Sequence, residues 1–234
     1  MSKLLEDQLA LVTGASRGIG AATAEALAAE GAHVILVART AAGLEEVEDR
    51  IHQVGGSATI APLDLTEGES IARLAAAIAE RWNKLDILVL NAATLGTLTP
   101  VSAIDGKEFN KVLTLNLVAQ QALIAAFDPL LRKSGDARLL AITSSVARQP
   151  RAYWGAYGAS KAALEGLVLS YAEEVRSFGV KAAIVDPGAT ATIMRARAFP
   201  GEDQATLKSP SVVGQAIAEA LSSDFDTGHR LVVR

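Results

Sequence analysis

Two side chains four residues apart, Tyr157 and Lys161, are the first candidates for catalysis in this sequence. They stand on a segment with helical periodicity and have only Gly, Ala and Ser between them, so the phenol and the ammonium share one helical face. A phenol with an ordinary pKa of about 10 transfers protons poorly near neutral pH, and a neighbouring cation favours the phenolate. The pair is therefore a candidate for proton transfer, although the same spacing also occurs on ordinary helices.

A second candidate group stands at the end of a predicted strand. The run Ala137–Ser144 is mostly apolar and ends in hydroxyl side chains, with Ser145 next to Ser144. Ligands of parallel sheets bind at the carboxyl ends of the strands, where a hydroxyl can donate a hydrogen bond to a substrate carbonyl. Hydroxyls at a strand end are also ordinary turn chemistry, and both interpretations stay open at this point.

A glycine-rich turn follows the first predicted strand and leads directly into a helical pattern. Glycines allow a tight turn and a close backbone approach, and the free N–H groups of the following helix then face a pyrophosphate. The spacing Gly-x-x-x-Gly-x-Gly differs from the common Gly-x-Gly-x-x-Gly, so its place after a first strand is what favours a dinucleotide site. We expect cofactor contacts from Thr13, Gly14, Ser16, Arg17, Gly18, Ile19 and Gly20.

The end of the second predicted strand indicates which dinucleotide is bound. Sites for NAD place an acidic residue about 20 positions after the glycines, whereas an Arg accommodates the 2′-phosphate of NADP. The strand His33–Ala38 is followed by Arg39 and by no carboxylate, and Arg17 lies within the glycine turn. Unless both guanidinium groups are simply solvated, the site prefers NADP(H) over NAD(H).

The composition excludes several other kinds of site. The 234 residues contain no cysteine, which removes disulfides, thiolate zinc sites and thiol nucleophiles. The three histidines are scattered, so we expect neither a histidine triad nor a metal site. A net charge of −4 and 4% aromatic residues give no reason to expect a nucleic-acid partner. The chemistry must come from Ser, Tyr, Lys, Arg or Asn side chains, or from a cofactor.

Short apolar runs alternate with longer amphipathic ones along the chain, which is the pattern of βαβ units around a parallel sheet. The short runs are rich in Val, Ile and Leu, as in strands that are buried on both faces. No stretch has the composition of a linker, so we expect one α/β domain over residues 1–234. We predict strands over Leu9–Thr13, His33–Ala38, Ser57–Pro62, Leu85–Asn91, Ala137–Ser144, Val180–Val185 and His229–Arg234, and helices over Gly18–Glu30, Ala42–Val54, Glu67–Trp82, Ile104–Lys133, Ala156–Phe178 and Pro210–Ser222.

The segment Ala189–Lys208 departs from this alternation. It carries Pro200 and Gly201, scattered charges and weak periodicity between the end of a strand and the start of a helix. Loops of this length in compact domains are often functional lids or partly disordered. Its place after the carboxyl end of a strand favours a substrate lid at about 189–208 over a mobile surface loop.

In this order and with these separations, the motifs resemble the short-chain dehydrogenase/reductase family over nearly the whole chain from about Leu9. The glycine turn is similar to the family's cofactor turn, Tyr157-x-x-x-Lys161 to its active-site signature, and Asn116 to its catalytic asparagine. The resemblance implies a single Rossmann-type, doubly wound parallel sheet of about seven strands in the order 3-2-1-4-5-6-7, with helices on both faces. It also implies cofactor contacts from Asp64, Leu65, Asn91, Ala92, Ala93, Pro187, Gly188, Thr190 and Thr192, besides Tyr157 and Lys161.

The same resemblance implies a role for each catalytic residue. Tyr157 would be the general acid in carbonyl reduction and the base in alcohol oxidation. Lys161 would lower the pKa of the phenol and bond the nicotinamide ribose, and Asn116 would anchor a water. A serine hydroxyl would polarise the carbonyl: the family's usual separation from the tyrosine selects Ser144, whereas an alignment on its usual Ser-Ser-x-x-Gly would select Ser145. We expect Ser144.

The substrate-binding residues are expected on two loops beside this site. Arg148, Arg151, Arg195 and Arg197 lie on these loops, and guanidinium groups match carboxylates and phosphates; the alternative is that these charges are solvated. Trp154 either walls the pocket or packs in the core. As a hypothesis, Arg148, Trp154 and Arg195 contact a small carbonyl or alcohol substrate that carries an anionic group.

The sequence thus predicts an NADP(H)-dependent oxidoreductase that transfers a hydride between the nicotinamide and a carbonyl or secondary alcohol. The alternative is a catalytically silent NADP(H)-binding regulator or scaffold, which the presence of Asn116, Ser144, Tyr157 and Lys161 disfavours. The resemblance further implies a homodimer or a homotetramer. No apolar signal segment and no long uninterrupted apolar stretch stand out, so we expect a cytoplasmic protein without a membrane span.

Overall fold

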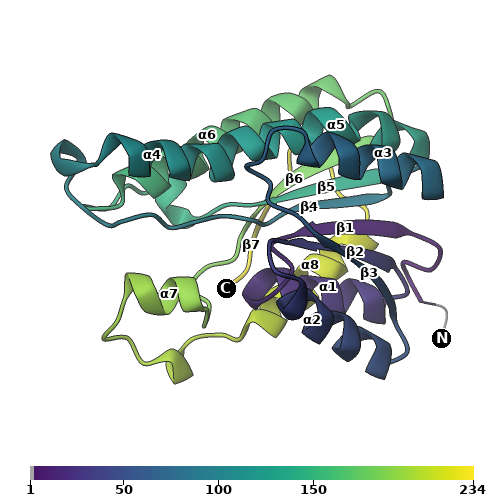
Figure 1. Cartoon of the computed structure of the whole chain (residues 1–234), viewed down its shortest axis with the longest axis horizontal. Helices are drawn as coiled ribbons and strands as arrows, with labels where there is room; N and C mark the ends of the chain where they lie inside the picture. Colours follow the sequence, from purple (N-terminus) through teal and green to yellow (C-terminus); the bar gives the residue numbers. More distant parts are fainter. Residues whose placement is uncertain (1–2) are drawn as a thin grey trace.

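In residues 3–234, which the computed structural model describes, seven parallel strands form the middle layer of the molecule (Figure 1). They are β1 (Leu9–Thr13), β2 (His33–Ala38), β3 (Ser57–Pro62), β4 (Ile87–Leu90), β5 (Ala137–Ile142), β6 (Val180–Asp186) and β7 (Arg230–Val232). The strands lie in the order β3-β2-β1-β4-β5-β6-β7, and each neighbouring pair is parallel. The predicted doubly wound sheet and its strand order are confirmed.

Helices cover both faces of this sheet (Figure 1). One face carries α1 (Gly18–Ala29), α2 (Ala41–Gln53) and α8 (Pro210–Ser222). The opposite face carries α3 (Ser70–Trp82), α5 (Ala119–Ser134) and α6 (Gly155–Glu174), and α4 (Gly106–Leu113) continues the line of α5 beyond the sheet. A short helix, α7 (Ile193–Ala198), lies apart from both helical layers.

Two hydrophobic cores, one on each face, hold these layers together. Because successive side chains of a strand point to opposite faces, β1 places Leu9 and Leu11 in the core with α3, α5 and α6. Its alternate residues Ala10 and Val12 enter the core with α1, α2 and α8. Full burial of a leucine contributes about 1.5–3 kcal/mol relative to exposure, so burial on both faces explains the continuous apolar runs in the sequence.

The predicted helix Ile104–Lys133 differs from the structure in two ways. It begins at Gly106, because the Asp105 carboxylate accepts hydrogen bonds from the backbone N–H groups of Lys107 and Glu108, at 3.0 and 2.9 Å. A π-helical segment, Thr114–Val118, also joins α4 to α5. Single π-helical turns inside α-helices are frequent at functional sites.

This continuous helix, Gly106–Ser134, is long and apolar enough to cross a membrane by length and composition alone. This finding differs from the sequence analysis, which expects no membrane span. The core helix of a soluble protein passes the same test, and Leu123, Phe127 and Leu131 are fully buried in the core between the helix and the sheet. The helix is therefore weak support for a membrane span.

The segment 189–208 is more regular than its sequence predicts. It contains α7, whose start is capped by the Thr192 hydroxyl accepting from the Arg195 N–H at 3.1 Å, and a short 3-10 turn. A parallel bridge between Thr190 and Lys208 closes the base of the segment, where the Ala191 N–H donates to the Lys208 carbonyl at 2.9 Å. The segment is thus a long connection between β6 and α8 whose two ends are held together by backbone pairing.

Candidate active site

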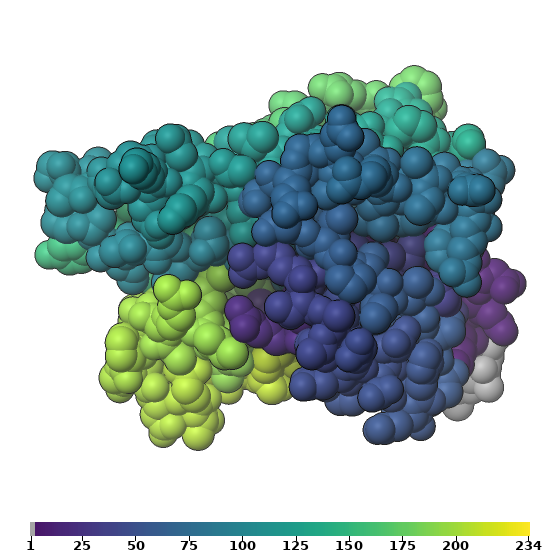
Figure 2. Space-filling view, viewed as in Figure 1, coloured from purple at the N-terminus to yellow at the C-terminus, as the bar shows by residue number. Residues whose placement is uncertain are grey.

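A cavity of about 1040 Å³ lies at the carboxyl ends of the strands, where the strand order reverses between β1 and β4. Ligands of open α/β sheets bind at this switch point. Ligand pockets usually measure about 300–1,000 Å³, so the volume suits a large ligand or two ligands together. Figure 2 shows the surface hollowed between the α7 segment, in yellow-green, and the teal helices above it.

Two glycines of the turn between β1 and α1 have no room for a side chain. Gly14 has a φ of +66°, and a Cβ on it would lie 2.8 Å from Asn91 Nδ2; a Cβ on Gly20 would lie 2.3 Å from the Gly14 carbonyl oxygen. Arg17 at the N-cap of α1 makes no side-chain cap hydrogen bond. The first N–H groups of α1 are thus available to an anion, and the turn fits the pyrophosphate of a dinucleotide.

Thr13 serves this turn in a different way from the one predicted. Its hydroxyl is fully buried, donates to the Val89 carbonyl at 3.1 Å and accepts from the backbone N–H of Asn91 at 3.0 Å. Asn91 Nδ2 in turn donates to the Thr13 carbonyl at 2.8 Å. Thr13 does not line the cavity, because its side chain joins the ends of β1 and β4. The other predicted cofactor-binding residues all line it.

Two guanidinium groups line the end of the cavity nearest the glycine turn. Arg17 and Arg39 both face it, and neither has a carboxylate oxygen within 4.0 Å among residues 3–234. The neighbouring Asp64 carboxylate accepts from the hydroxyl and the N–H of Thr66, at 2.7 and 2.9 Å. These hydrogen bonds, with a smaller contribution from Arg39, lower the pKa of Asp64. The arginines are thus free to bind an anionic ligand.

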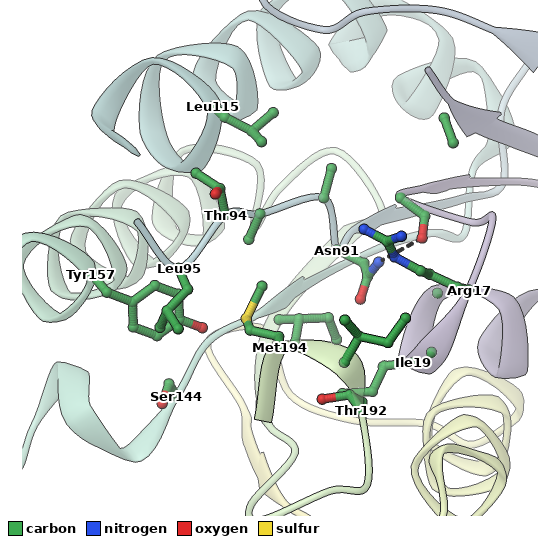
Figure 3. A pocket seen from close by; sticks show the side chains of 18 of the residues that line it. Arg17, Ile19, Asn91, Thr94, Leu95, Leu115, Ser144, Tyr157, Thr192 and Met194 are labelled. Carbon is green, nitrogen blue, oxygen red and sulfur yellow. Dashed lines mark hydrogen bonds between the residues drawn. The ribbon is translucent and has the colours of Figure 1, made fainter. Parts of the chain in front are cut away.

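Tyr157 and Ser144 lie at the other end of the cavity, across from Arg17 and Asn91 (Figure 3). Tyr157 is 7% exposed and packs with Leu95 and Val146. Burial raises the pKa of its phenol, and the charge of Asp186 adds to this effect. The phenol is therefore protonated at neutral pH in the absence of a ligand.

Lys161 lies behind this phenol and is almost completely buried. Its Nζ is 5.9 Å from the centre of the Tyr157 ring and donates to the Ile142 carbonyl at 2.7 Å. Burial lowers the pKa of Lys161 to about 8. The rise in the pKa of Tyr157 comes from burial and from Asp186, so the role expected of Lys161, to lower this pKa, stays a prediction.

The lowered pKa of Lys161 predicts a pH-dependent stability of the cofactor-free protein. Between about pH 8 and its ordinary 10.5, the unfolded chain holds a proton on Lys161 that the folded chain has lost. The free energy of unfolding should therefore rise across this window, by roughly 3 kcal/mol at most. Urea unfolding at several pH values, with Lys161→Met as the control that lacks this group, measures the difference. Identical pH slopes for the two proteins would contradict the account.

Asn116 lies in the π-helical segment and is fully buried behind the cavity rather than in its lining. Its amide accepts from the Thr94 N–H at 2.8 Å and donates to the Thr94 carbonyl at 2.9 Å and to Ser160 Oγ at 3.0 Å. Ser160 Oγ donates to the Tyr157 carbonyl at 2.7 Å. Asn116 thus connects the loop after β4 to the helix that carries Tyr157.

Of the predicted substrate residues, Trp154 and Arg195 line the cavity and Arg148 does not. Arg148 is outside the cavity lining, because its Nε lies 3.7 Å from a carboxylate oxygen of Glu165. Arg195 lines the cavity, but its guanidinium forms a two-point ion pair with Glu202, at 2.6 Å for both contacts. Trp154 lines the cavity and packs edge-on against Tyr157, with ring centres 5.9 Å apart. The structure does not bring Arg148 to the site, and it neutralises the charge of Arg195.

Glu165 is a functional candidate that sequence reasoning missed. It is 7% exposed on α6, one turn beyond Lys161. Its carboxylate accepts from Thr143 Oγ1 at 2.7 Å and from Arg230 Nη1 and Nη2 at 2.8 and 2.6 Å. Burial opposes ionisation, yet the hydrogen bonds from Arg230 and Thr143 lower the pKa of Glu165. The signal for this cluster in the sequence is a glutamate four residues after Lys161, on the same helical face.

A glycine turn at the switch point of a parallel sheet and the Tyr157–Lys161 pair line opposite ends of one cavity. Rossmann-type oxidoreductases have this arrangement. The sequence profile of the short chain dehydrogenase family matches residues 8–203. The chain belongs to this family, as the resemblance predicted.

Individual relatives agree with this assignment. The uncharacterized oxidoreductase YciK of Escherichia coli is 40% identical over 211 residues, which cover 89% of this chain and 83% of the relative. A short chain dehydrogenase structure from Pseudomonas syringae has a TM-score of 0.96 and 38% identity, and covers 100% of this chain and 97% of that one. An Escherichia coli short chain dehydrogenase complexed with NADPH has a TM-score of 0.94 and 37% identity, with 100% and 99% covered.

Proposed function

We propose that this chain is an NADP(H)-dependent oxidoreductase that transfers a hydride between the nicotinamide and a small carbonyl or secondary alcohol. The observation that carries the proposal is that one cavity is lined by the glycine turn, by Arg17 and Arg39, and by Tyr157. In this proposal residues 1–234 act as one dinucleotide-binding domain. Bound NADP(H) supplies the hydride, while the protein supplies position and electrostatics.

The cofactor would lie with its 2′-phosphate toward Arg17 and Arg39, and the relative complexed with NADPH supports this choice. Two uncompensated arginines, rather than a carboxylate, follow β1 and β2. The residues proposed to hold the cofactor are Gly14, Ser16, Arg17, Gly18, Ile19, Gly20, Arg39, Asp64, Leu65, Asn91, Ala92, Ala93, Tyr157, Lys161, Pro187, Gly188, Thr190 and Thr192.

The protein's own residues would then manage the proton. During reduction the Tyr157 phenol, protonated because of its raised pKa, donates its proton to the carbonyl oxygen. The Ser144 hydroxyl donates a hydrogen bond to the same oxygen, and the Lys161 ammonium stabilises the phenolate that remains. In oxidation the phenolate accepts the proton of the alcohol.

The choice between Ser144 and Ser145 gives a direct test of this geometry. Ser144 lines the main cavity, whereas Ser145 lines only a small adjoining one of about 140 Å³. We expect Ser144→Ala to lower kcat/KM for carbonyl reduction by about 10²–10³-fold, the cost of losing one donor to a developing oxyanion. Ser145→Ala is the matched control and should stay close to wild type. Loss of activity in Ser145→Ala alone would reverse the assignment.

The cofactor preference predicts the effect of Arg39→Ala. A hydrogen bond to a charged group is worth about 1.5–3 kcal/mol, so the KM for NADPH should rise by about 10- to 100-fold. The KM for NADH, which lacks the 2′-phosphate, should change little. Initial rates with both cofactors measure the ratio, and an unchanged preference for NADPH in an Arg17→Ala/Arg39→Ala variant would contradict the proposal.

We also propose that segment 189–208 acts as a substrate lid. Support comes from its fixed base at Thr190 and Lys208 and from Ile193 and Met194, which line the cavity from this segment. A cytoplasmic location and a homodimer or homotetramer are further parts of the proposal, carried by the family resemblance. Sedimentation that shows only monomers would contradict the assembly.

A further inference from the structure

Three cations line the end of the cavity that is farthest from the glycine turn. Lys107 and Lys111 lie one turn apart on α4, so they share one helical face, and Arg197 lies on α7. Figure 1 shows α4 above α7 at the left of the view, with α1 and α2 farther to the right, and residues of α4 and α7 line the cavity together. These cations are therefore separate from the arginines proposed to bind the cofactor.

Of the three cations, only Lys111 has a carboxylate oxygen within 4.0 Å among residues 3–234. Glu202 is occupied by Arg195, and Glu108 approaches Lys111 only to 4.0 Å. Lys107 and Arg197 have no carboxylate within 4.0 Å among residues 3–234. The opening thus has an excess of positive charge that an anion between α4 and α7 would relieve.

The wall between this opening and the hydroxyl groups is largely apolar. Leu95, Trp154 and Met194 line the cavity there, and Tyr157 and Ser144 lie beyond them. Figure 3 shows Leu95 and Met194 beside the Tyr157 ring. A ligand that matches this order of groups has a carbonyl at one end, an apolar middle and a negative charge at the other end.

We propose that Lys107, Lys111 and Arg197 form an anion subsite that selects carbonyl substrates bearing a carboxylate or a phosphate remote from the reacting carbon. The inference rests on the proposed oxidoreductase function for its substrate, but the subsite itself is a binding property. It replaces Arg148 and Arg195, whose charges are already used by Glu165 and Glu202.

Binding to the protein–NADP⁺ complex tests the subsite without any turnover. Calorimetric titration with phenyl phosphate and with benzoate should show binding that weakens as salt is added. In a Lys107→Ala/Lys111→Ala/Arg197→Ala variant the Kd for both anions should rise by about tenfold or more, because charge-assisted contacts are lost. Neutral benzyl alcohol should bind both proteins equally, and the affinity for NADP⁺ should not change.

A control variant removes the same number of positive charges as the subsite variant, but at positions away from the cavity. Arg73→Ala/Lys133→Ala/Arg176→Ala removes three exposed cations far from the cavity lining, and this variant should bind phenyl phosphate like wild type. Equal affinity for both anions in wild type and in the subsite variant, or no binding to wild type, would overturn the proposal. A stronger loss for phenyl phosphate than for benzoate would identify phosphate esters as the favoured class.

Measurements of turnover distinguish a failure of the proposed subsite from a failure of the proposed oxidoreductase function. With para-formylbenzoate and its methyl ester as substrates, the acid-to-ester ratio of kcat/KM should fall by about tenfold in the subsite variant, with kcat for the ester unchanged. If wild type reduces no carbonyl but loses anion binding in the variant, the oxidoreductase function fails and the subsite stands. If wild type turns over but the ratio does not change, the subsite fails and the function stands.

Discussion

Replacing Tyr157 with Phe will lower kcat for carbonyl reduction by about 10²–10⁴-fold, which is the usual contribution of a positioned general acid. The affinity for NADPH should stay close to wild type. The phenylalanine ring can keep the packing against Trp154 and Leu95. No hydrogen bond of the Tyr157 hydroxyl is found within residues 3–234, so its removal leaves no protein group unpaired. The loss would therefore report on chemistry rather than on folding.

Tyr153→Phe is the matched control for this experiment. Tyr153 is 58% exposed and lies outside the cavity lining, although it is close to Tyr157 in sequence. Steady-state oxidation of NADPH with one aldehyde, together with titration of NADPH binding, measures both proteins. If Tyr157→Phe retains wild-type kcat, the assignment of Tyr157 as the proton donor is wrong.

Replacing Glu165 with Ala will lower the free energy of unfolding by about 3–5 kcal/mol, the cost of removing one partner of a buried ion pair. The side chains of Glu165 and Arg230 are 9% and 19% exposed. Without the carboxylate, the Arg230 guanidinium would keep little water and would lose its bonded ion-pair partner, with only the more distant charge of Asp186 left. Thr143, which precedes Ser144, would lose its partner as well. The C-terminal strand β7 is thus tied to the end of β5 through one carboxylate.

Urea unfolding of the full chain measures this effect. Glu173→Ala is the control, because its ion pair with Arg176 is more than half exposed on both sides and should contribute at most about 1 kcal/mol. A Glu165→Leu/Arg230→Met double variant should recover most of the stability, since it leaves no buried charge. A Glu165→Ala protein as stable as Glu173→Ala would contradict the account of this cluster.

The strands and the glycine turn were predictable because burial on both faces leaves continuous apolar runs, and a tight turn leaves glycines. Leu9–Thr13 and His33–Ala38 were predicted with their observed bounds. The sequence did not show that Thr13 and Arg148 lie outside the cavity lining, because their positions depend on contacts distant in sequence. Thr13 bonds Val89, and Arg148 approaches Glu165.

Other features left only a weak trace in the sequence. The π-helical segment around Asn116 has no periodicity of its own, and the cation pair on α4 is visible only as a lysine spacing of one turn. The ion pair of Glu165 with Arg230 joins residues 65 apart. The pKa of Tyr157 depends on its burial, which the Tyr-x-x-x-Lys spacing does not report.

The most direct test of the proposed function is the oxidation of NADPH by the wild-type protein across a panel of aldehydes and ketones, measured together with NADPH affinity. The account predicts tight NADPH binding and turnover of at least one class of carbonyl, with kcat lowered by about 10²–10⁴-fold in Tyr157→Phe. Tight binding without turnover of any carbonyl, and without oxidation of the corresponding alcohols by NADP⁺, would contradict it and indicate a cofactor-binding regulator.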